Sequence, residues 1–216
     1  MTGSLIWLLP AACALVDWYA VWRDDRRTET WAKPATLIAL IAAALALGAA
    51  DTSAGRWLLV ALVFGLAGDV FLLDKGNQRF RLGLAAFLVG HVAFVVSFIQ
   101  LGLDPRSWNY VSLLVLGGCL LATRQVATST YLRGGLALAA PVGLYTVVIG
   151  AMVIYAFTTG EPLIAVGATI FALSDTVLAR DRFVRPWDGA RLLVIVTYHV
   201  GQALIVLGVL AATEGR

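Results

Sequence analysis

The sequence has few charged residues and almost no cysteine. Asp, Glu, Lys and Arg make up 13% of its 216 residues, whereas 60% are hydrophobic. Soluble domains have about 25% charged residues, and the mean hydropathy here is +0.86. The composition therefore excludes an ordinary soluble enzyme and predicts an integral membrane protein. The only cysteines, Cys13 and Cys119, fall in apolar segments, so we expect neither a disulfide nor a metal site from them.

The chain also lacks long polar linkers and low-complexity tracts. We expect an all-α fold, a single transmembrane helical domain over residues 1–216. A bilayer core of about 30 Å needs roughly 20 apolar residues per crossing helix, and this predicts about eight spans. Their approximate bounds are 4–22, 34–50, 56–73, 82–103, 108–123, 135–158, 162–179 and 190–212.

The lysines and arginines gather in alternate loops. Such residues are retained in the cytoplasm, so both termini are predicted to lie outside. Tryptophans near most span ends agree with this arrangement, and the net charge of +3 reflects topology rather than affinity for nucleic acid. The cytoplasmic set is Arg23, Arg26, Arg27, Lys33, Lys75, Arg79, Arg81, Arg124, Arg133, Arg180, Arg182, Arg185 and Arg191, and the opposite set is Arg56, Arg106 and Arg216.

Five titratable residues fall inside the predicted spans: Asp17, Asp69, His91, Asp175 and His199. An ionised Asp at mid-bilayer depth costs roughly 2.5–3.5 kcal/mol on insertion scales, and such residues usually face the bundle interior and mark function. All five lie in the half of their spans that is nearer the basic loops. We expect them to occupy the cytoplasmic half of one bundle.

Other polar residues on the last three spans are candidate neighbours of these groups: Tyr145, Ser174, Tyr198 and Gln202. With them, polar groups from at least five helices are expected to converge on one interior pocket. The alternative is that they only hydrogen-bond to one another between helices, which is common in membrane bundles.

The two Asp-containing stretches suggest an internal repeat. Asp69 and Asp175 each end an apolar span, a basic loop follows, and His91 or His199 lies in the next span. Both copies run in the same direction, which predicts a parallel duplication of four spans each with a pocket at the interface of the repeats, as in some transporters.

Several short motifs, in a fixed order, resemble the YhhN-like lysoplasmalogenases, a family of small multi-span membrane hydrolases. The resemblance covers nearly the whole chain. Phe94 departs from the expected pattern, since a tyrosine is expected there. The residues that carry the resemblance are Lys33-Pro34, Gly68-Asp69, Phe80, Gly83, Phe87, Gly90-His91, Pro141, Tyr145, Gly167-Ala168, Phe171, Ser174-Asp175, Leu178-Ala179, Phe183, Tyr198 and Gln202.

The resemblance implies hydrolysis of the vinyl ether of a lysoplasmalogen, which gives a fatty aldehyde and a glycerophospho-alcohol. This chemistry calls for a carboxylic acid that protonates the alkenyl carbon and a carboxylate that stabilises the resulting cation and activates water. Asp69 and Asp175 are the expected catalytic residues, without cofactor or metal. Expected substrate-binding residues are Lys33, His91, Tyr145, Ser174, Tyr198, His199, Gln202 and Asp17. Lys33 is a candidate for binding the substrate phosphate, although its charge also helps to set the orientation of the protein in the membrane.

A small proton-coupled transporter or lipid carrier is the alternative function, because intramembrane Asp and His residues also form proton relays. The Asp residues are all expected near the cytoplasmic side of the membrane. This favours the enzyme, because an enzyme needs an opening on only one side, whereas a transporter needs a path through both halves. The expected partners are a lysophospholipid-like amphiphile and membrane lipid, not nucleic acid. The sequence is also compatible with a homo-oligomer. The expected location is a bacterial inner membrane, with the active site toward the cytoplasm.

Overall fold

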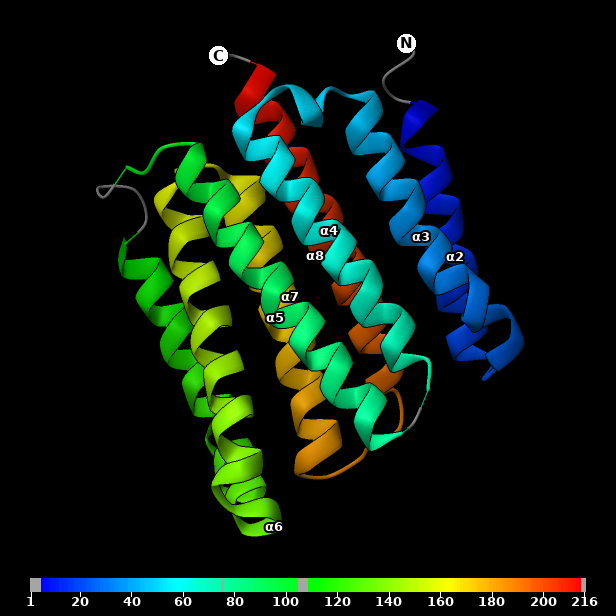
Figure 1. The fold of residues 1–216 in the computed structure, drawn as a ribbon, viewed down its shortest axis with the longest axis vertical. Coiled ribbons are helices and arrows are strands. Elements are labelled where there is room, and N and C mark those ends of the chain that lie inside the picture. The colour runs from blue at the N-terminus through cyan, green and yellow to red at the C-terminus, as the bar shows by residue number, and fades with distance from the viewer. Residues whose placement is uncertain (1–4, 75, 105–108, 215–216) are drawn as a thin grey trace. The chain divides into compact units, whose positions relative to one another are not determined.

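The computed structural model describes residues 5–74, 76–104 and 109–214. Over these residues the chain is built from α-helices, with one short 3₁₀ helix and no strand (Figure 1). The predicted all-α class is therefore confirmed. Four residues used above for orientation or the span ends lie outside the described residues: Lys75, Arg106, Trp108 and Arg216.

The helices divide into two compact units. The first comprises residues 1–101 with 206–216, and the second comprises residues 102–205. The expectation of a single domain stays a prediction, as does the 4+4 repeat.

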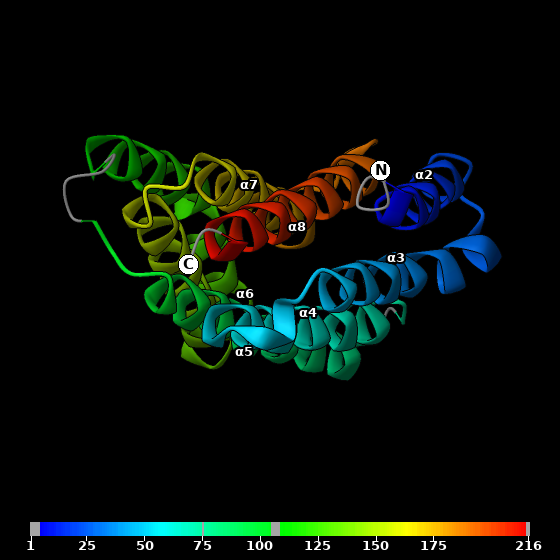
Figure 2. The ribbon, with the colours of Figure 1, turned by 90° about the horizontal axis from the view of Figure 1, so that it is seen from above.

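The first unit contains α2 (Leu8–Trp22), α3 (Arg26–Ala46), η1 (Ala49–Asp51), α4 (Ser53–Leu72) and α5 (Asn77–Gln100). Helices α4 and α5 lie side by side (Figure 2), and glycines allow their close approach. A Cβ on Gly90 would lie 3.2 Å from the carbonyl oxygen of Ala61, and one on Gly68 would overlap the ring of Phe87. Small residues of this kind are typical of helix contacts in membranes. The packing at Gly68 fixes the neighbouring Asp69 in the buried interior.

Helix α3 begins at Arg26, well before the expected span at 34. The carboxylate of Asp25 explains this start, because it accepts hydrogen bonds from the backbone N–H groups of Arg27 and Thr28 at 3.1 and 3.2 Å. This is a side-chain cap of the first helical turn. The expected start of this segment at residue 34 is therefore wrong. Lys33 lies inside α3, just before Pro34.

The second unit contains α6 (Asn109–Thr158), α7 (Pro162–Phe183) and most of α8 (Ala190–Glu214). Helix α6 has 50 residues but is interrupted at Gly135, where φ is 58° and ψ is −153°. The chain turns back on itself there (Figure 1). Residues 124–134, expected to form a loop between two spans, are helical instead. They contain no proline and no glycine before Gly134, so nothing in them ends the first limb.

Helices α7 and α8 approach each other closely through two glycines. A Cβ on Gly167 would lie 2.8 Å from the carbonyl oxygen of Gly201, and a Cβ on Gly201 would lie 2.9 Å from that of Gly167. Any larger residue would force the backbones apart. This contact sets the height at which the polar residues of the two helices meet.

Among the described residues, six helices are long and apolar enough to cross a membrane, and α2 is a shorter apolar helix. The protein is thus an integral multi-pass membrane protein. At 1.5 Å per residue, α6 would span about 75 Å, far more than the roughly 30 Å of a bilayer core. Its interruption at Gly135 is therefore needed if both limbs lie in the membrane. The count of eight spans stays a prediction.

Candidate active site

A buried ion pair joins α3 to α4 in the first unit. The Nζ atom of Lys33 lies 3.1 Å from Oδ1 of Asp69, and the two side chains are 14% and 1% exposed. The aliphatic stem of Lys33 is what lets an ammonium reach so far inward. An apolar interior tolerates opposite charges when they are paired. The candidate catalytic Asp69 thus has a cationic partner on a neighbouring helix.

Two further predicted residues of the first unit, Asp17 on α2 and His91 on α5, are also buried. His91 Nδ1 lies 2.5 Å from the carbonyl oxygen of Phe87, one turn earlier on the same helix. A carbonyl oxygen only accepts, so Nδ1 carries the proton. In the neutral ring, Nε2 is then the acceptor nitrogen.

The second unit pairs its buried carboxylate differently. The hydroxyl of Tyr145, on the second limb of α6, donates a hydrogen bond of 2.8 Å to Oδ2 of Asp175 on α7. Asp175 is 9% exposed. A phenol donor satisfies one carboxylate oxygen without adding a charge. Asp69 and Asp175 therefore lie in unlike settings, one facing an ammonium and the other a neutral hydroxyl.

The remaining predicted residues of the second unit are buried on α7 and α8. Ser174 donates to the carbonyl oxygen of Val194 at 2.9 Å, which joins the two helices. The ring of Tyr198 packs edge-on against Phe171, with centroids 5.3 Å apart, and lies 5.3 Å from the ring of His199. Ser174 thus has a structural partner, as the alternative of interhelical hydrogen bonding predicts for it.

Gln202 has a different environment. It is completely buried in α8, yet in the described part of the chain neither its amide nitrogen nor its amide oxygen has a hydrogen-bond partner. Leaving a buried amide unsatisfied costs about 1–3 kcal/mol. Such a group is well suited to bind a ligand or an ordered water.

Within each unit the structure brings two of the predicted residues into contact. It joins Lys33 to Asp69 and Tyr145 to Asp175. Convergence of all these groups on one pocket stays a prediction. The sequence reasoning missed both pairings, although opposite charges in adjacent apolar segments are a signal that could have revealed the first. It also missed that Arg180 donates a hydrogen bond of 2.9 Å to the carbonyl oxygen of Ala122.

Within residues 5–74, 76–104 and 109–214, no group of three or more His, Cys, Asp or Glu side chains is arranged to hold a metal ion. The buried side chains of the described interior include three carboxyl groups, two imidazoles and one amide, which belong to Asp17, Asp69, Asp175, His91, His199 and Gln202. This arrangement suits proton transfer.

These features define a class: a multi-span helical membrane protein with paired carboxylates buried among its helices. The sequence model of the YhhN family matches residues 28–209. The chain belongs to the YhhN family, which confirms the resemblance seen in its motifs.

Similar proteins carry a functional name. The chain is 29% identical over 208 residues to human lysoplasmalogenase TMEM86B, with 94% of this chain and 86% of that protein covered. It is 30% identical to human lysoplasmalogenase TMEM86A, with 81% and 73% covered. A lysoplasmalogenase of Mycobacterium bovis is 29% identical, with 71% and 60% covered. No solved structure matches the chain.

Proposed function

We propose that this chain is a membrane-embedded hydrolase that cleaves the vinyl ether bond of lysoplasmalogens, which are alkenyl glycerophospholipids with one chain. The products are a fatty aldehyde and a glycerophospho-alcohol. The observation that carries the proposal is the similarity over most of the chain to proteins named lysoplasmalogenase. The buried carboxylates support it, because the reaction is acid–base chemistry on an uncharged ether.

The reaction needs no redox step and consumes one water. A proton adds to the alkenyl carbon remote from the oxygen, and the adjacent carbon becomes an oxocarbenium-like cation. Water attacks that carbon and loses a proton to a base, which gives a hemiacetal. The hemiacetal hydroxyl then gives up its proton as the bond to the glycerol oxygen breaks, the glycerol oxygen takes up a proton, and the aldehyde is released. A proton donor and a carboxylate are the groups that such a path requires.

Asp69 and Asp175 are the proposed acid–base residues. Their unlike partners support a division of roles, since different surroundings are how two carboxyl groups come to differ in protonation. The close contact between Lys33 and Asp69 gives Lys33 a positioning role on this carboxyl group. Tyr145 plays the corresponding part for Asp175.

The other predicted residues are proposed to hold the substrate. Gln202 is the strongest of these, because its buried amide offers two donors and an acceptor that no described residue uses. His91 and His199 supply imidazole nitrogens, and Asp17 and Tyr198 supply buried oxygen atoms. We also place the enzyme in a bacterial inner membrane, with both termini outside and the active site toward the cytoplasm. The distribution of lysine and arginine supports this orientation.

Aldehyde release by the detergent-purified protein from a lysoplasmalogen tests the function. Asp69→Asn and Asp175→Asn should each abolish release by protein that is separately shown to be folded. Asp51→Asn, which removes an exposed carboxylate beside α4, should keep the activity. No release by the folded parent would refute the proposal, and proton-coupled flux in liposomes would then be measured.

A further inference from the structure

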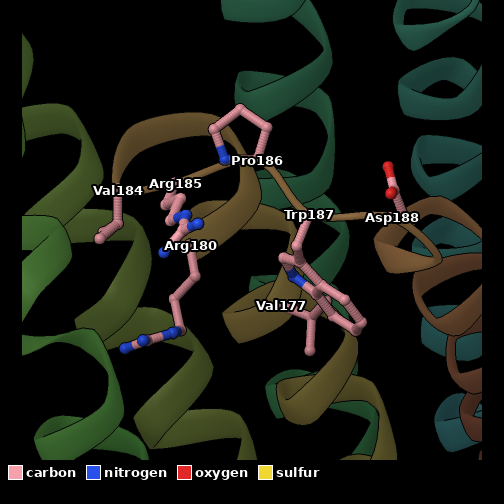
Figure 3. A pocket seen from close by; sticks show the side chains of 7 residues that line it. All are labelled: Val177, Arg180, Val184, Arg185, Pro186, Trp187 and Asp188. Carbon is pink, nitrogen blue, oxygen red and sulfur yellow. The ribbon is translucent and has the colours of Figure 1, made fainter.

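An open pocket of about 620 Å³ lies where α7 ends and the chain turns toward α8 (Figure 3). Arg180, Val184, Arg185, Trp187 and Asp188 are among the residues that line it. A second pocket, of about 580 Å³, shares Val184 and is otherwise lined by α6. The two pockets therefore meet at the C-terminal end of α7.

The wall of the first pocket is fixed by hydrogen bonds. The N–H groups of Val184 and Arg185 both donate to the carbonyl oxygen of Arg180, at 2.9 and 3.0 Å. The N–H of Trp187 donates to Oδ1 of Asp181 at 3.2 Å. The loop thus folds back on the last turn of α7, and the pocket is a formed feature of the fold.

Cations face this pair of pockets from α6, from α7 and from the loop that follows α7. Arg180 and Arg185 line the first pocket, and Arg124 of α6 lines the second. In the part of the chain that the structure describes, no carboxylate lies within 4.0 Å of these three guanidinium groups. Arg180 uses one N–H group on the carbonyl oxygen of Ala122, and a guanidinium has five. Figure 3 shows Asp188 on the side of the first pocket opposite Arg180 and Arg185.

The rest of the lining is amphipathic. Trp187 is 49% exposed, and Val177, Val184 and Pro186 add apolar surface. Tryptophan is enriched at the level of the lipid head groups. On the α6 side, the lining includes Ser129, whose hydroxyl group can donate a hydrogen bond, and Thr128, whose hydroxyl group donates to the carbonyl oxygen of Arg124 at 3.3 Å. The pocket thus has polar groups that suit a phosphate. Beside them it has apolar surface that suits the part of a lipid next to its glycerol.

We propose that this pocket pair binds the phosphate diester of an anionic phospholipid as a resident lipid. Guanidinium groups bind phosphate oxygens through paired hydrogen bonds. Basic pockets between helices on the cytoplasmic side of a membrane are where anionic head groups bind, and the predicted orientation puts these arginines on that side. The proposal does not depend on the hydrolytic activity, because it concerns a lipid that is bound and not cleaved.

Lipid binding to the full chain in detergent, measured by native mass spectrometry, tests the proposal. The probes are phosphatidylglycerol, which is anionic, phosphatidylcholine, which is zwitterionic, and glycerol 3-phosphate, which has no chains. An arginine near an anionic head group contributes about fivefold in affinity. Arg185→Gln should therefore weaken phosphatidylglycerol binding about fivefold, and Arg180→Gln with Arg185→Gln about 25-fold.

Arg133→Gln is the matched control, because it removes an exposed arginine of α6 that does not line either pocket. Preferential binding of phosphatidylglycerol that is lost in the pocket variants and kept in this control supports the site. Unchanged binding in folded Arg185→Gln protein would overturn it, as would an equal loss in the control. Binding of glycerol 3-phosphate as tight as that of the lipid would identify a soluble phosphate ester and overturn the lipid assignment.

Discussion

Replacing Lys33 with methionine should destabilise the protein more than removing both charges of the ion pair. Met keeps the apolar bulk of the stem but leaves the carboxylate of Asp69, 1% exposed, without its cation. At 3.1 Å and an effective dielectric constant of about 20, the direct attraction is about 5 kcal/mol. Breaking a buried pair by removing one partner generally costs about 3–5 kcal/mol, which agrees with this value.

The double variant Lys33→Met with Asp69→Asn should recover much of that loss, because no uncompensated charge remains. For a protein of this size, 3–5 kcal/mol corresponds to a fall in the apparent Tm of roughly 6–20 °C. The assay is thermal unfolding of parent, single and double variants in the same detergent. If the single variant unfolds at the same temperature as the double variant or above it, the ion pair does not stabilise the fold as argued.

The same variant separates two roles of Lys33 in activity. If its ammonium positions Asp69, as their contact indicates, Lys33→Met should lower kcat for a lysoplasmalogen and leave KM nearly unchanged. If Lys33 instead binds the substrate phosphate, KM should rise. A rise in KM at constant kcat would refute the positioning role.

Three further predictions follow from single contacts. Tyr145→Phe removes only the hydroxyl that donates to Asp175 at 2.8 Å. The kcat for aldehyde release should therefore fall at least tenfold, and the loss of stability should be about 1–3 kcal/mol. Full activity would show that the reaction does not use this hydrogen bond. Gly167→Ala should lower stability by about 1–3 kcal/mol, because its Cβ would lie 2.8 Å from a backbone oxygen of α8, whereas Gly143→Ala, with nothing within 4 Å of its Cβ, should be neutral or stabilising in a thermal melt. Hydrogen bonds from the side chain and backbone of Thr28 lower the pKa of Asp25. The cap that Asp25 forms on α3 is therefore fully present above the ordinary pKa of about 3.9 and is lost as the pH falls through the lowered pKa. Hydrogen exchange in the first turn of α3 should rise only in that acid range, and a rise that begins near pH 6 would contradict the prediction.

The long apolar helices were predictable because a bilayer requires long apolar runs. The polar ends of the helices were not predictable in this way, because hydropathy does not distinguish a polar helical segment from a polar loop. Helix α3 gains its first turns from the capping carboxylate of Asp25, in a segment too polar to be counted as a span. The same limitation made the helical segment 124–134 look like a loop.

The candidate carboxylates were predictable for a different physical reason. An Asp in an apolar run is costly and therefore informative, and both Asp69 and Asp175 are buried as expected. Their partners required knowledge of which helices pack together and at what height. Only the structure shows that Lys33 contacts Asp69 and that Tyr145 contacts Asp175.

The heights of these partners follow a common rule. Helices joined by a short connection pack antiparallel, so residues equally far from the connection lie at the same level. Lys33 and Asp69 are each roughly four turns from the connection between α3 and α4. Tyr145 and Asp175 are each roughly four turns from the connection between α6 and α7.

Each unit thus contains a helical hairpin whose second helix carries the carboxyl group and whose first helix carries its partner, the ammonium of Lys33 or the hydroxyl of Tyr145. The order is the same in both, although the repeat of four spans stays a prediction. The partners differ in charge, and a charged partner and a neutral one hold their carboxyl groups in different electrostatic surroundings. If Asp69 and Asp175 are the catalytic pair, this difference between lysine and tyrosine is what would separate the acid from the base.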